Sequence, residues 1–240
     1  MVEGAIKLSG ASSYKAFIGS GVSFRVEKST LLEYKGNRKN SLKSVYLDEV
    51  TEYLCKKFKC EVITGIEVDD ACVIAAYKNP NRFILGEDKD YYGCPIKYFN
   101  INKSEDGVVD CNKFGHIYRN SKGDVKGEGR MFFYWQVAAQ DDSDNYKAHC
   151  FSDVPWGEVR AYDWIVGCKT DKEALEKVAR AYQHLYPESK TVIGWRGEEI
   201  TLDWLYVLNE NWHMARMLRN MKERENPIDI HPVLEKYKIE

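Results

Sequence analysis

Short apolar runs between polar and glycine residues predict β-strands in the first half of the chain. Each run holds at most five residues, a length typical of a buried strand and too short for a helix. The predicted strands cover residues 16–18, 61–64, 83–85 and 97–101. The polar passage after the last of them predicts a hairpin around residues 106–120, followed by a glycine-punctuated loop at 120–130.

Apolar residues at helical spacing predict helices between and after these strands. Residues 1–9 predict a short helix, and residues 41–59 predict an amphipathic helix that we expect to pack on the sheet. The C-terminal third is mainly helical, with one helix over 171–187 that has Asp171 as its N-cap and a longer one over 200–222.

Hydrophobic periodicity alone does not decide the secondary structure of residues 131–139 and 223–240. The apolar run at 131–139 fits a strand or a helix. We interpret it as a helix with a core-forming aromatic cluster, because the acidic residues 140–145 read as its C-terminal extension or the turn after it. The tail at 223–240 is charged and holds two prolines, so we expect part of it to be extended.

Strands that alternate with helices predict an α/β fold with a mostly parallel sheet flanked by helices. We divide the chain of 240 residues into an α/β core at 1–128 and a helical C-terminal part at 129–240. The formal net charge of −2 argues against a uniformly basic surface for nucleic acid, but 35 lysines and arginines leave room for a local basic face.

Cysteine and histidine patterns argue against zinc. Seven cysteines without any C-x-x-C pair are interpreted as reduced thiols of a cytoplasmic protein. The five histidines show no ligand spacing and are interpreted as structural. No run of 18 apolar residues and no signal peptide occurs, so we expect no membrane partner.

Acidic residues follow the second and third predicted strands in succession. The first cluster is Glu67, Asp69 and Asp70, and the second includes Asp88 and Asp90. Because the carboxyl ends of parallel strands meet at one edge of a sheet, we expect both clusters to line one crevice. Each cluster alone also fits a structural role, as helix N-terminal carboxylates or as a solvated turn.

A third acidic cluster contains Asp141 and Asp144, which would share one face if the segment is helical. Three carboxylate clusters in one domain favour a hard divalent cation, Mg²⁺ or Mn²⁺. The basic segment at 31–40 carries Lys35 and Arg38 and fits either a solvated loop or a phosphate-contacting loop.

Four motifs occur in a fixed order, at 34–38 (YKGNR), 65–70 (GIEVDD), 87–90 (EDKD) and 140–145 (QDDSDN). Over residues 14–150 their order and spacing resemble those of the bacteriophage 5′→3′ exonucleases of the flap-endonuclease superfamily, which have a PIN-like 5′ nuclease core. Residues 214–220 (MARMLRN) are similar to the C-terminal helix of the short podophage-type enzymes.

The resemblance implies divalent-metal-dependent phosphodiester hydrolysis on DNA, as a 5′→3′ exonuclease or a 5′-flap endonuclease. It implies a nuclease core at 1–128, a DNA-binding part at 129–240, DNA with a free 5′ end or flap as the partner, and the host cytoplasm as the location. Lys35 and Arg38 match the catalytic basic pair, and Tyr34 and Lys147 are expected to bind substrate. The implied ligands of Mg²⁺ or Mn²⁺ are Glu67, Asp69, Asp70, Asp88, Asp90, Asp141 and Asp144.

Two differences from the family pattern leave other hypotheses open. The family begins with a strand that ends in Asp-Gly, and residues 2–4 (VEG) lie too close to the next strand to replace it. Ser20 also stands where the family usually has an aspartate. The alternatives are a catalytically weakened protein that recognises DNA 5′ ends or junctions, and one half of a split nuclease whose truncated core is completed by a separate N-terminal fragment chain. A related PIN-like ribonuclease is a third alternative, against which the long helical C-terminal part argues.

Overall fold

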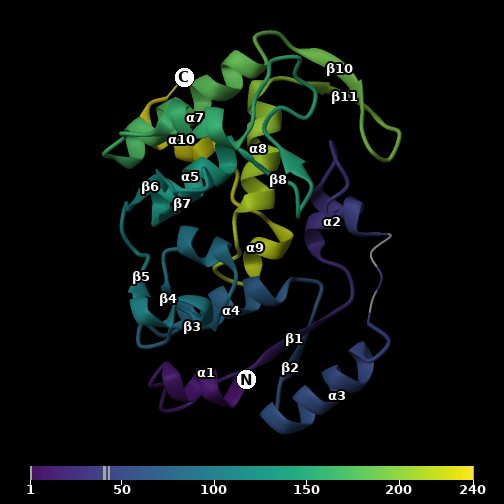
Figure 1. Cartoon of the computed structure of the whole chain (residues 1–240). Coiled ribbons are helices and arrows are strands. Elements are labelled where there is room, and N and C mark those ends of the chain that lie inside the picture. Colours follow the sequence, from purple (N-terminus) through teal and green to yellow (C-terminus); the bar gives the residue numbers. More distant parts are fainter. Residues whose placement is uncertain (1, 40–41, 43, 240) are drawn as a thin grey trace.

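The computed structural model describes residues 2–39, 42 and 44–239 and shows a mixed α/β protein (Figure 1). Its N-terminal part contains two short parallel strands, β1 (Phe17–Ser20) and β2 (Glu61–Thr64). The helices around them are α1 (Val2–Leu8), α2 (Phe24–Lys28) and α3 (Leu47–Phe58). The short N-terminal helix and both strands were predicted from the apolar runs, and the structure confirms them.

Helix α3 differs from its prediction in length and in packing. It begins at Leu47, six residues later than expected, and residues 41 and 43 of the predicted span lie outside the described residues. Only Phe58 of this helix is buried, whereas Val50 and Tyr53 are exposed. The expectation that its whole apolar stripe packs on the sheet was therefore wrong.

A second, three-stranded sheet follows α4 (Val68–Tyr77). Strand β3 (Ile84–Gly86) pairs in parallel with β4 (Lys97–Asn100), which pairs antiparallel with β5 (Val109–Asp110). Two short helical turns, η2 (Lys89–Gly93) and η3 (Ile101–Asp106), flank β4.

The predicted mostly parallel sheet is not formed. Strands β1–β2 and β3–β4–β5 make separate sheets, and four of the six strand pairs among the described residues are antiparallel. Helix α4 contacts both β1 and β3, so the two parallel pairs lie on either side of one helix instead of sharing an edge.

A β-hairpin extends into the segment that was predicted to be a loop because of its glycines. Strand β6 (His116–Arg119) pairs with β7 (Val125–Glu128). The Asn120 side-chain oxygen accepts bonds from the backbone N–H of Lys122 at 3.0 Å and of Asp124 at 2.9 Å, which closes the turn. This Asx-type turn explains why a polar, glycine-containing stretch connects two strands here.

The main core surrounds α5 (Arg130–Ala138), the helix predicted from the aromatic run. Phe132, Tyr134 and Trp135 are buried there, as expected for core residues. The helices packed around α5 are α6 (Glu158–Ile165), α7 (Asp171–Leu185) and α8 (Trp204–Ala215). Helix α7 has Thr170 as its N-cap, whose hydroxyl accepts from the backbone N–H of Glu173, so the predicted N-cap is one position off.

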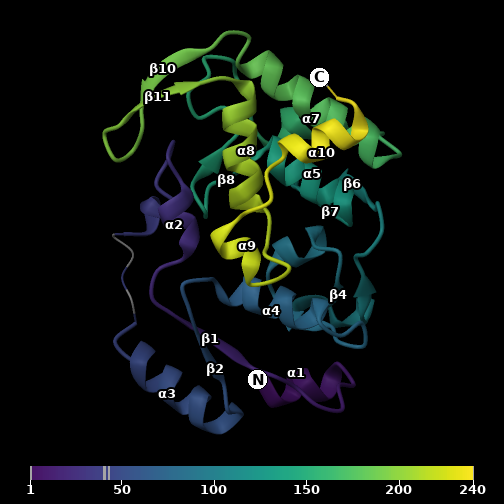
Figure 2. The ribbon, with the colours of Figure 1, turned by 180° about the vertical axis from the view of Figure 1, so that it is seen from behind.

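The C-terminal part also contains strands that periodicity did not reveal. These are the hairpins β8 (Gln140–Asp141) with β9 (Tyr146–Lys147), and β10 (Lys190–Ile193) with β11 (Glu199–Leu202). The long helix predicted over 200–222 is shorter, because 199–202 is a strand and α8 ends at Ala215. The tail includes α9 (Lys222–Glu225) and α10 (His231–Tyr237), and Figure 2 shows α9 next to α4 and the end of α8.

Two further predictions concern the whole described chain. All seven cysteines are free thiols, as expected. Among the described helices, none combines the length and the apolar character that a membrane crossing requires.

Candidate functional site

A polar cavity of about 160 Å³ lies between α4, the turn after β3, the β8–β9 turn and the segment that follows α8. Its basic lining residues are Arg25, Lys35, Arg38 and Lys89. Its acidic lining residues are Glu67, Asp69, Asp70, Asp88, Asp90 and Asp144. The structure therefore brings members of all three predicted acidic clusters to one cavity, together with the predicted basic pair.

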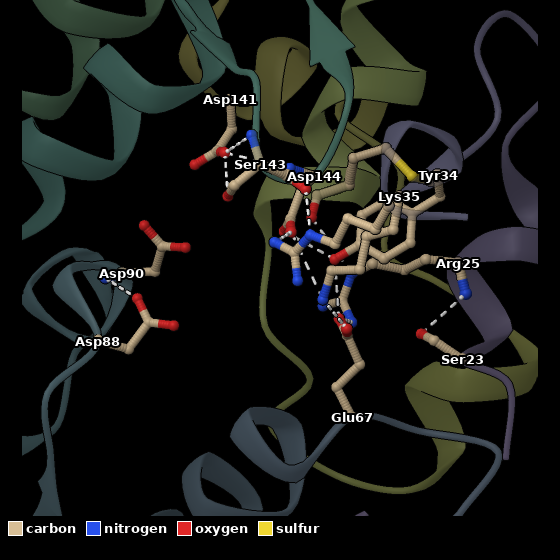
Figure 3. A network of polar contacts seen from close by, with 12 residues as sticks. Ser23, Arg25, Tyr34, Lys35, Glu67, Asp88, Asp90, Asp141, Ser143 and Asp144 are labelled. Carbon is tan, nitrogen blue, oxygen red and sulfur yellow. Dashed lines mark hydrogen bonds and ion pairs between the residues drawn. The ribbon is translucent and has the colours of Figure 1, made fainter. Parts of the chain in front are cut away.

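The cavity has two sides that differ in how their charges are matched (Figure 3). On the first, which we name the paired side, the carboxylates of Glu67, Asp70 and Asp144 bind cationic side chains of the chain. On the second, the open side, Asp69, Asp88 and Asp90 have neutral hydrogen-bond partners. Within the described residues, no carboxylate of the open side forms an ion pair.

Arg25 is the centre of the paired side and is buried, with its side chain 3% exposed. Its guanidinium binds Asp70 through two hydrogen bonds of 2.6 and 2.9 Å, and it donates to Glu67 at 3.0 Å. The remaining bonds go to the backbone carbonyls of Met214 and Arg216. All five guanidinium N–H groups therefore have acceptors, which offsets the cost of burying the charge.

Asp70 is fully buried and is held from three directions. Besides Arg25, it accepts hydrogen bonds from the backbone N–H of Leu218 at 2.9 Å and of Glu67 at 3.3 Å, the latter within the first turn of α4. Both carboxylate oxygens are thus occupied by protein donors. The metal-ligand role expected for Asp70 stays a prediction, and in this structure Arg25 occupies the carboxylate that a metal ion would bind.

Tyr34 and Lys35, just before η1 (Gly36–Arg38), and Arg38, the last residue of η1, join the paired side. The Tyr34 hydroxyl lies 2.8 Å from both a Glu67 and an Asp144 oxygen. Lys35 donates to Glu67 and lies 3.4 Å from Asp144, and Arg38 donates to Asp144 at 3.1 Å. The predicted basic pair is therefore at the site but already neutralised by carboxylates.

The backbone of this loop is itself tied to the β8–β9 turn. Lys35 has a φ of 57°, in the left-handed region that side chains other than glycine seldom adopt. Its N–H donates to the Asp144 carbonyl at 3.0 Å, and Asn145 donates to the Glu33 carbonyl at 2.9 Å. These contacts hold Lys35 in an unfavourable conformation and aim its ammonium at the cavity.

The open side places three carboxylates against neutral groups. Asp69 accepts from the Tyr91 hydroxyl at 2.7 Å, Asp90 accepts from the Gln136 amide at 2.6 Å, and Asp88 caps η2 by accepting from the Asp90 N–H at 2.9 Å. Burial, with the Asp88 charge adding to it, raises the pKa of Asp69 to about 6 and that of Asp90 to about 7. These elevated values show that the negative charge is poorly compensated here.

The third acidic cluster lies in a hairpin turn and not on a helix. Asp141 accepts from the Ser143 N–H at 2.8 Å and pairs with Lys89 at 3.1 Å. Burial alone would raise the pKa of Asp141, but the Ser143 hydrogen bond and the Lys89 ammonium lower it. Asp141 does not line the cavity, whereas Asp144 does. The expectation that both share a helical face was therefore wrong.

Lys147 also departs from its predicted role. It does not line the main cavity, and its ammonium lies 3.2 Å from the exposed Asp142 carboxylate. Of the other expected substrate-binding residues, Tyr34 lines a second, smaller cavity together with Lys147.

The metal site stays a prediction, and the described residues form no preformed ligand cluster for it. Among the residues that the structure describes, no three acidic, histidine or cysteine side chains are close enough to hold one ion together. Glu67, Asp70 and Asp144 are engaged by cations of the chain. The carboxylates of the open side remain, and Mg²⁺ is commonly held by one or two carboxylates completed by water and substrate phosphate. The open side fits that donor set.

Sequence reasoning missed Arg25, Gln136 and Tyr91. Arg25 lies in a short helix with no motif, and only burial beside Asp70 makes it a site residue. Gln136 belongs to the run interpreted as a core helix, and Tyr91 follows the second acidic cluster without being part of any motif. No local pattern distinguishes such residues, because their role depends on contacts with segments far away in the chain.

Comparison of the chain with protein-family models, with curated proteins and with solved structures gave no match in any of the three searches. The geometry and electrostatics of the cavity are therefore the main indication of what this protein does. The motif resemblance described above adds an expectation about the substrate.

Proposed function

We propose that this protein hydrolyses phosphodiester bonds of DNA with a divalent metal, as a 5′→3′ exonuclease or a 5′-flap endonuclease. The observation that carries the proposal is one cavity in which three carboxylates without ion pairs, Asp69, Asp88 and Asp90, accompany the cations Lys35 and Arg38. Carboxylates for a metal and cations for a phosphate are the two components that this reaction needs. The choice of DNA 5′ ends rests on the order of the motifs.

Asp88 and Asp90 are the residues that would hold Mg²⁺ or Mn²⁺, with Asp69 beside them. Burial and mutual repulsion already raise the pKa of Asp69 and of Asp90, so a bound cation would relieve an existing electrostatic cost. When bound, such an ion polarises a phosphoryl oxygen and makes water a stronger nucleophile. Gln136 orients Asp90, and Tyr91 orients Asp69.

Lys35 and Arg38 would bind the phosphate through charge-assisted hydrogen bonds. In the structure both cations pair with Asp144, so phosphate binding requires an exchange of partner. Arg38 is the more accessible of the two, with its side chain 48% exposed against 27% for Lys35. We expect Arg38 to make the first phosphate contact and Lys35 to complete it deeper in the cavity.

The direct test is cleavage of a labelled 5′-flap duplex in Mg²⁺. We expect cleavage by the unmodified protein, loss of it after chelation, and a fall of roughly 10²–10³-fold in Asp88→Asn, comparable to removal of a principal electrostatic group from an active site. Asp142→Asn is the matched control, because Asp142 is an exposed carboxylate outside the cavity and should keep full activity.

A second function is favoured by the paired side itself. Three of the cavity carboxylates are neutralised by Arg25, Lys35 and Arg38, which leaves fewer ligands for metals than a two-metal site needs. This arrangement suits a protein that binds DNA 5′ ends or junctions without cutting them. Salt-sensitive binding of the flap duplex with no cleavage in Mg²⁺ or Mn²⁺ would replace the first proposal by this one.

A further inference from the structure

Helix α3 and the residues just before it carry large apolar side chains that are exposed among the described residues. The exposed large apolar side chains between residues 42 and 53 are Leu42, Val45, Tyr46, Leu47, Val50 and Tyr53. Val50 is 50% exposed and Tyr53 is 58% exposed. Both views place α3 at the edge of the molecule (Figures 1 and 2). So many exposed apolar side chains on one short segment mark an interaction surface and are unusual for free protein surface.

The spacing of these residues is that of a helix-pairing seam. Tyr46, Val50 and Tyr53 are separated by four and three positions, so they form one stripe along the outer side of α3. The residues that pack on the protein lie beside this stripe and at its C-terminal end: Phe58 is buried, Cys55 is partly buried, and Lys57 pairs with Glu3 of α1 at 3.1 Å. Tyr46, Val50 and Tyr53 are each at least half-exposed, so this part of the stripe can contact another helix.

The charged residues beside the stripe indicate that the partner helix is α3 of a second copy of the chain. Glu49 and Lys56 lie seven positions apart, so both flank the stripe on the same edge. In an antiparallel pair of identical helices, the flanking edge of one helix faces the same edge of the other. Glu49 of each copy then lies opposite Lys56 of the other copy, which gives two equivalent ion pairs. In a parallel pair this edge would face Leu47 and Leu54 instead, with no charge partner.

We propose that α3 is the interface of a homodimer in which two copies of α3 pair antiparallel about a two-fold axis. An isologous contact needs one surface that is complementary to itself, and the apolar stripe with its Glu49–Lys56 edge meets this requirement. Lys56 already donates to Glu52 within its own helix at 2.5 Å, and in the dimer it reaches Glu49 of the second copy as well. The proposal is independent of the activity proposed for the cavity.

The test measures molecular mass by light scattering after size-exclusion chromatography, over a range of protein concentrations. We expect a mass that rises from the 27.8 kDa of one chain toward twice that value. Glu49→Lys and Lys56→Glu should each raise the dimer dissociation constant roughly tenfold, since two ion pairs become repulsive contacts. Val50→Asp, in the middle of the stripe, should leave only monomer.

Mixing the two single variants provides the decisive result. In a heterodimer of Glu49→Lys with Lys56→Glu, every flanking contact is attractive again, so the mixture should dimerise more tightly than either variant does alone. Asp48→Lys is the matched control, because Asp48 is an acidic residue of the same helical turn on the far side from the stripe, and it should dimerise normally. Circular dichroism confirms that each variant is folded.

Monomer at every soluble concentration of the unmodified protein would overturn the proposal. A dimer that responds to Asp48→Lys as strongly as to Glu49→Lys, or variants whose mixture fails to associate, would place the contact elsewhere and overturn it too.

Discussion

The two sides of the cavity contain the same type of side chain in opposite electrostatic situations. On the paired side, Glu67, Asp70 and Asp144 are matched by cations of the chain. On the open side, Asp69 and Asp90 have neutral partners and elevated pKa values. The first side is complete without a ligand, whereas the second has charge that an external cation would compensate. A carboxylate near a cavity is thus a candidate metal ligand only when no cationic side chain of the protein already pairs with it.

The largest expected effect comes from breaking the paired side at Arg25. Arg25→Ala leaves Asp70 buried without its counter-ion, so we expect the free energy of unfolding to fall by about 3–5 kcal/mol. Urea denaturation measures this difference. Lys172→Ala is the control, since Lys172 and Glu176 form an exposed pair whose removal should cost less than about 0.5 kcal/mol.

A double-mutant cycle sharpens the same point. If Arg25 and Asp70 act as a unit, Arg25→Met combined with Asp70→Leu should destabilise far less than the sum of the two single variants. Additive effects would mean that the two residues are not coupled, and the distinction between the two sides would then lose its main support.

The open side is tested by the response of stability to metal. Saturating Mg²⁺ or Mn²⁺ should stabilise the unmodified protein by up to about 2.7 kcal/mol when the metal is at one hundred times its dissociation constant. Differential scanning fluorimetry with and without chelator measures this as a rise in Tm. Asp88→Asn and Asp90→Asn should lose the rise, whereas Asp142→Asn should keep it. A rise retained in both cavity variants would assign metal binding to another place.

A smaller loss of stability is expected when one hydrogen bond of the paired side is removed. The Tyr34 hydroxyl lies 2.8 Å from Glu67 and from Asp144 and can donate to only one of them at a time. Tyr34→Phe should therefore reduce the free energy of unfolding by about 1 kcal/mol, the usual contribution of one hydrogen bond. A loss as large as that of Arg25→Ala would show that Tyr34, and not Arg25, organises this side.

The smallest effect is a loss of stability in mild acid that arises near the paired side. His213 is mostly buried on α8, next to Met214, whose carbonyl supports Arg25. Burial lowers the pKa of His213 below its ordinary value of 6.5, although Asp229 partly opposes the shift. Folding therefore favours the neutral ring, and its contribution is complete above pH 6.5 and decreases as the pH falls below it.

Urea denaturation between pH 7.5 and 5 checks this prediction. The slope of stability against pH should be shallower in His213→Gln than in the unmodified protein. His116→Gln, at a largely exposed position on β6, should leave the slope unchanged.

Much of the local structure could be predicted because its causes are local. The short strands β1 to β4 follow from apolar runs, α7 from helical periodicity and α5 from an aromatic run. The strand pairing could not be predicted, because it depends on which distant segments meet. Helix α4 contacts both β1 and β3, and so separates two parallel pairs that seemed to belong to one sheet.

The same limit applies to the candidate site. Sequence spacing indicated that the first two acidic clusters would meet, and Glu67 and Asp88 do line one cavity. Lys35, Arg38 and Asp144, which the motif resemblance added to the site, line the same cavity. It could not show which carboxylates would remain unmatched. That depends on Arg25, which enters from α2 and reaches α4 and the segment after α8 at the same time.

The amino-acid sequence by itself determined the positions of most helices and strands and the identity of the charged residues near the cavity. These features follow from side-chain patterns within a few residues of one another. Only the tertiary structure decided that Asp70 is matched by Arg25 while Asp69 and Asp90 are left with neutral partners. The physical reason is that burial and ion pairing are sums over contacts between distant segments, and the folded chain alone brings those segments together.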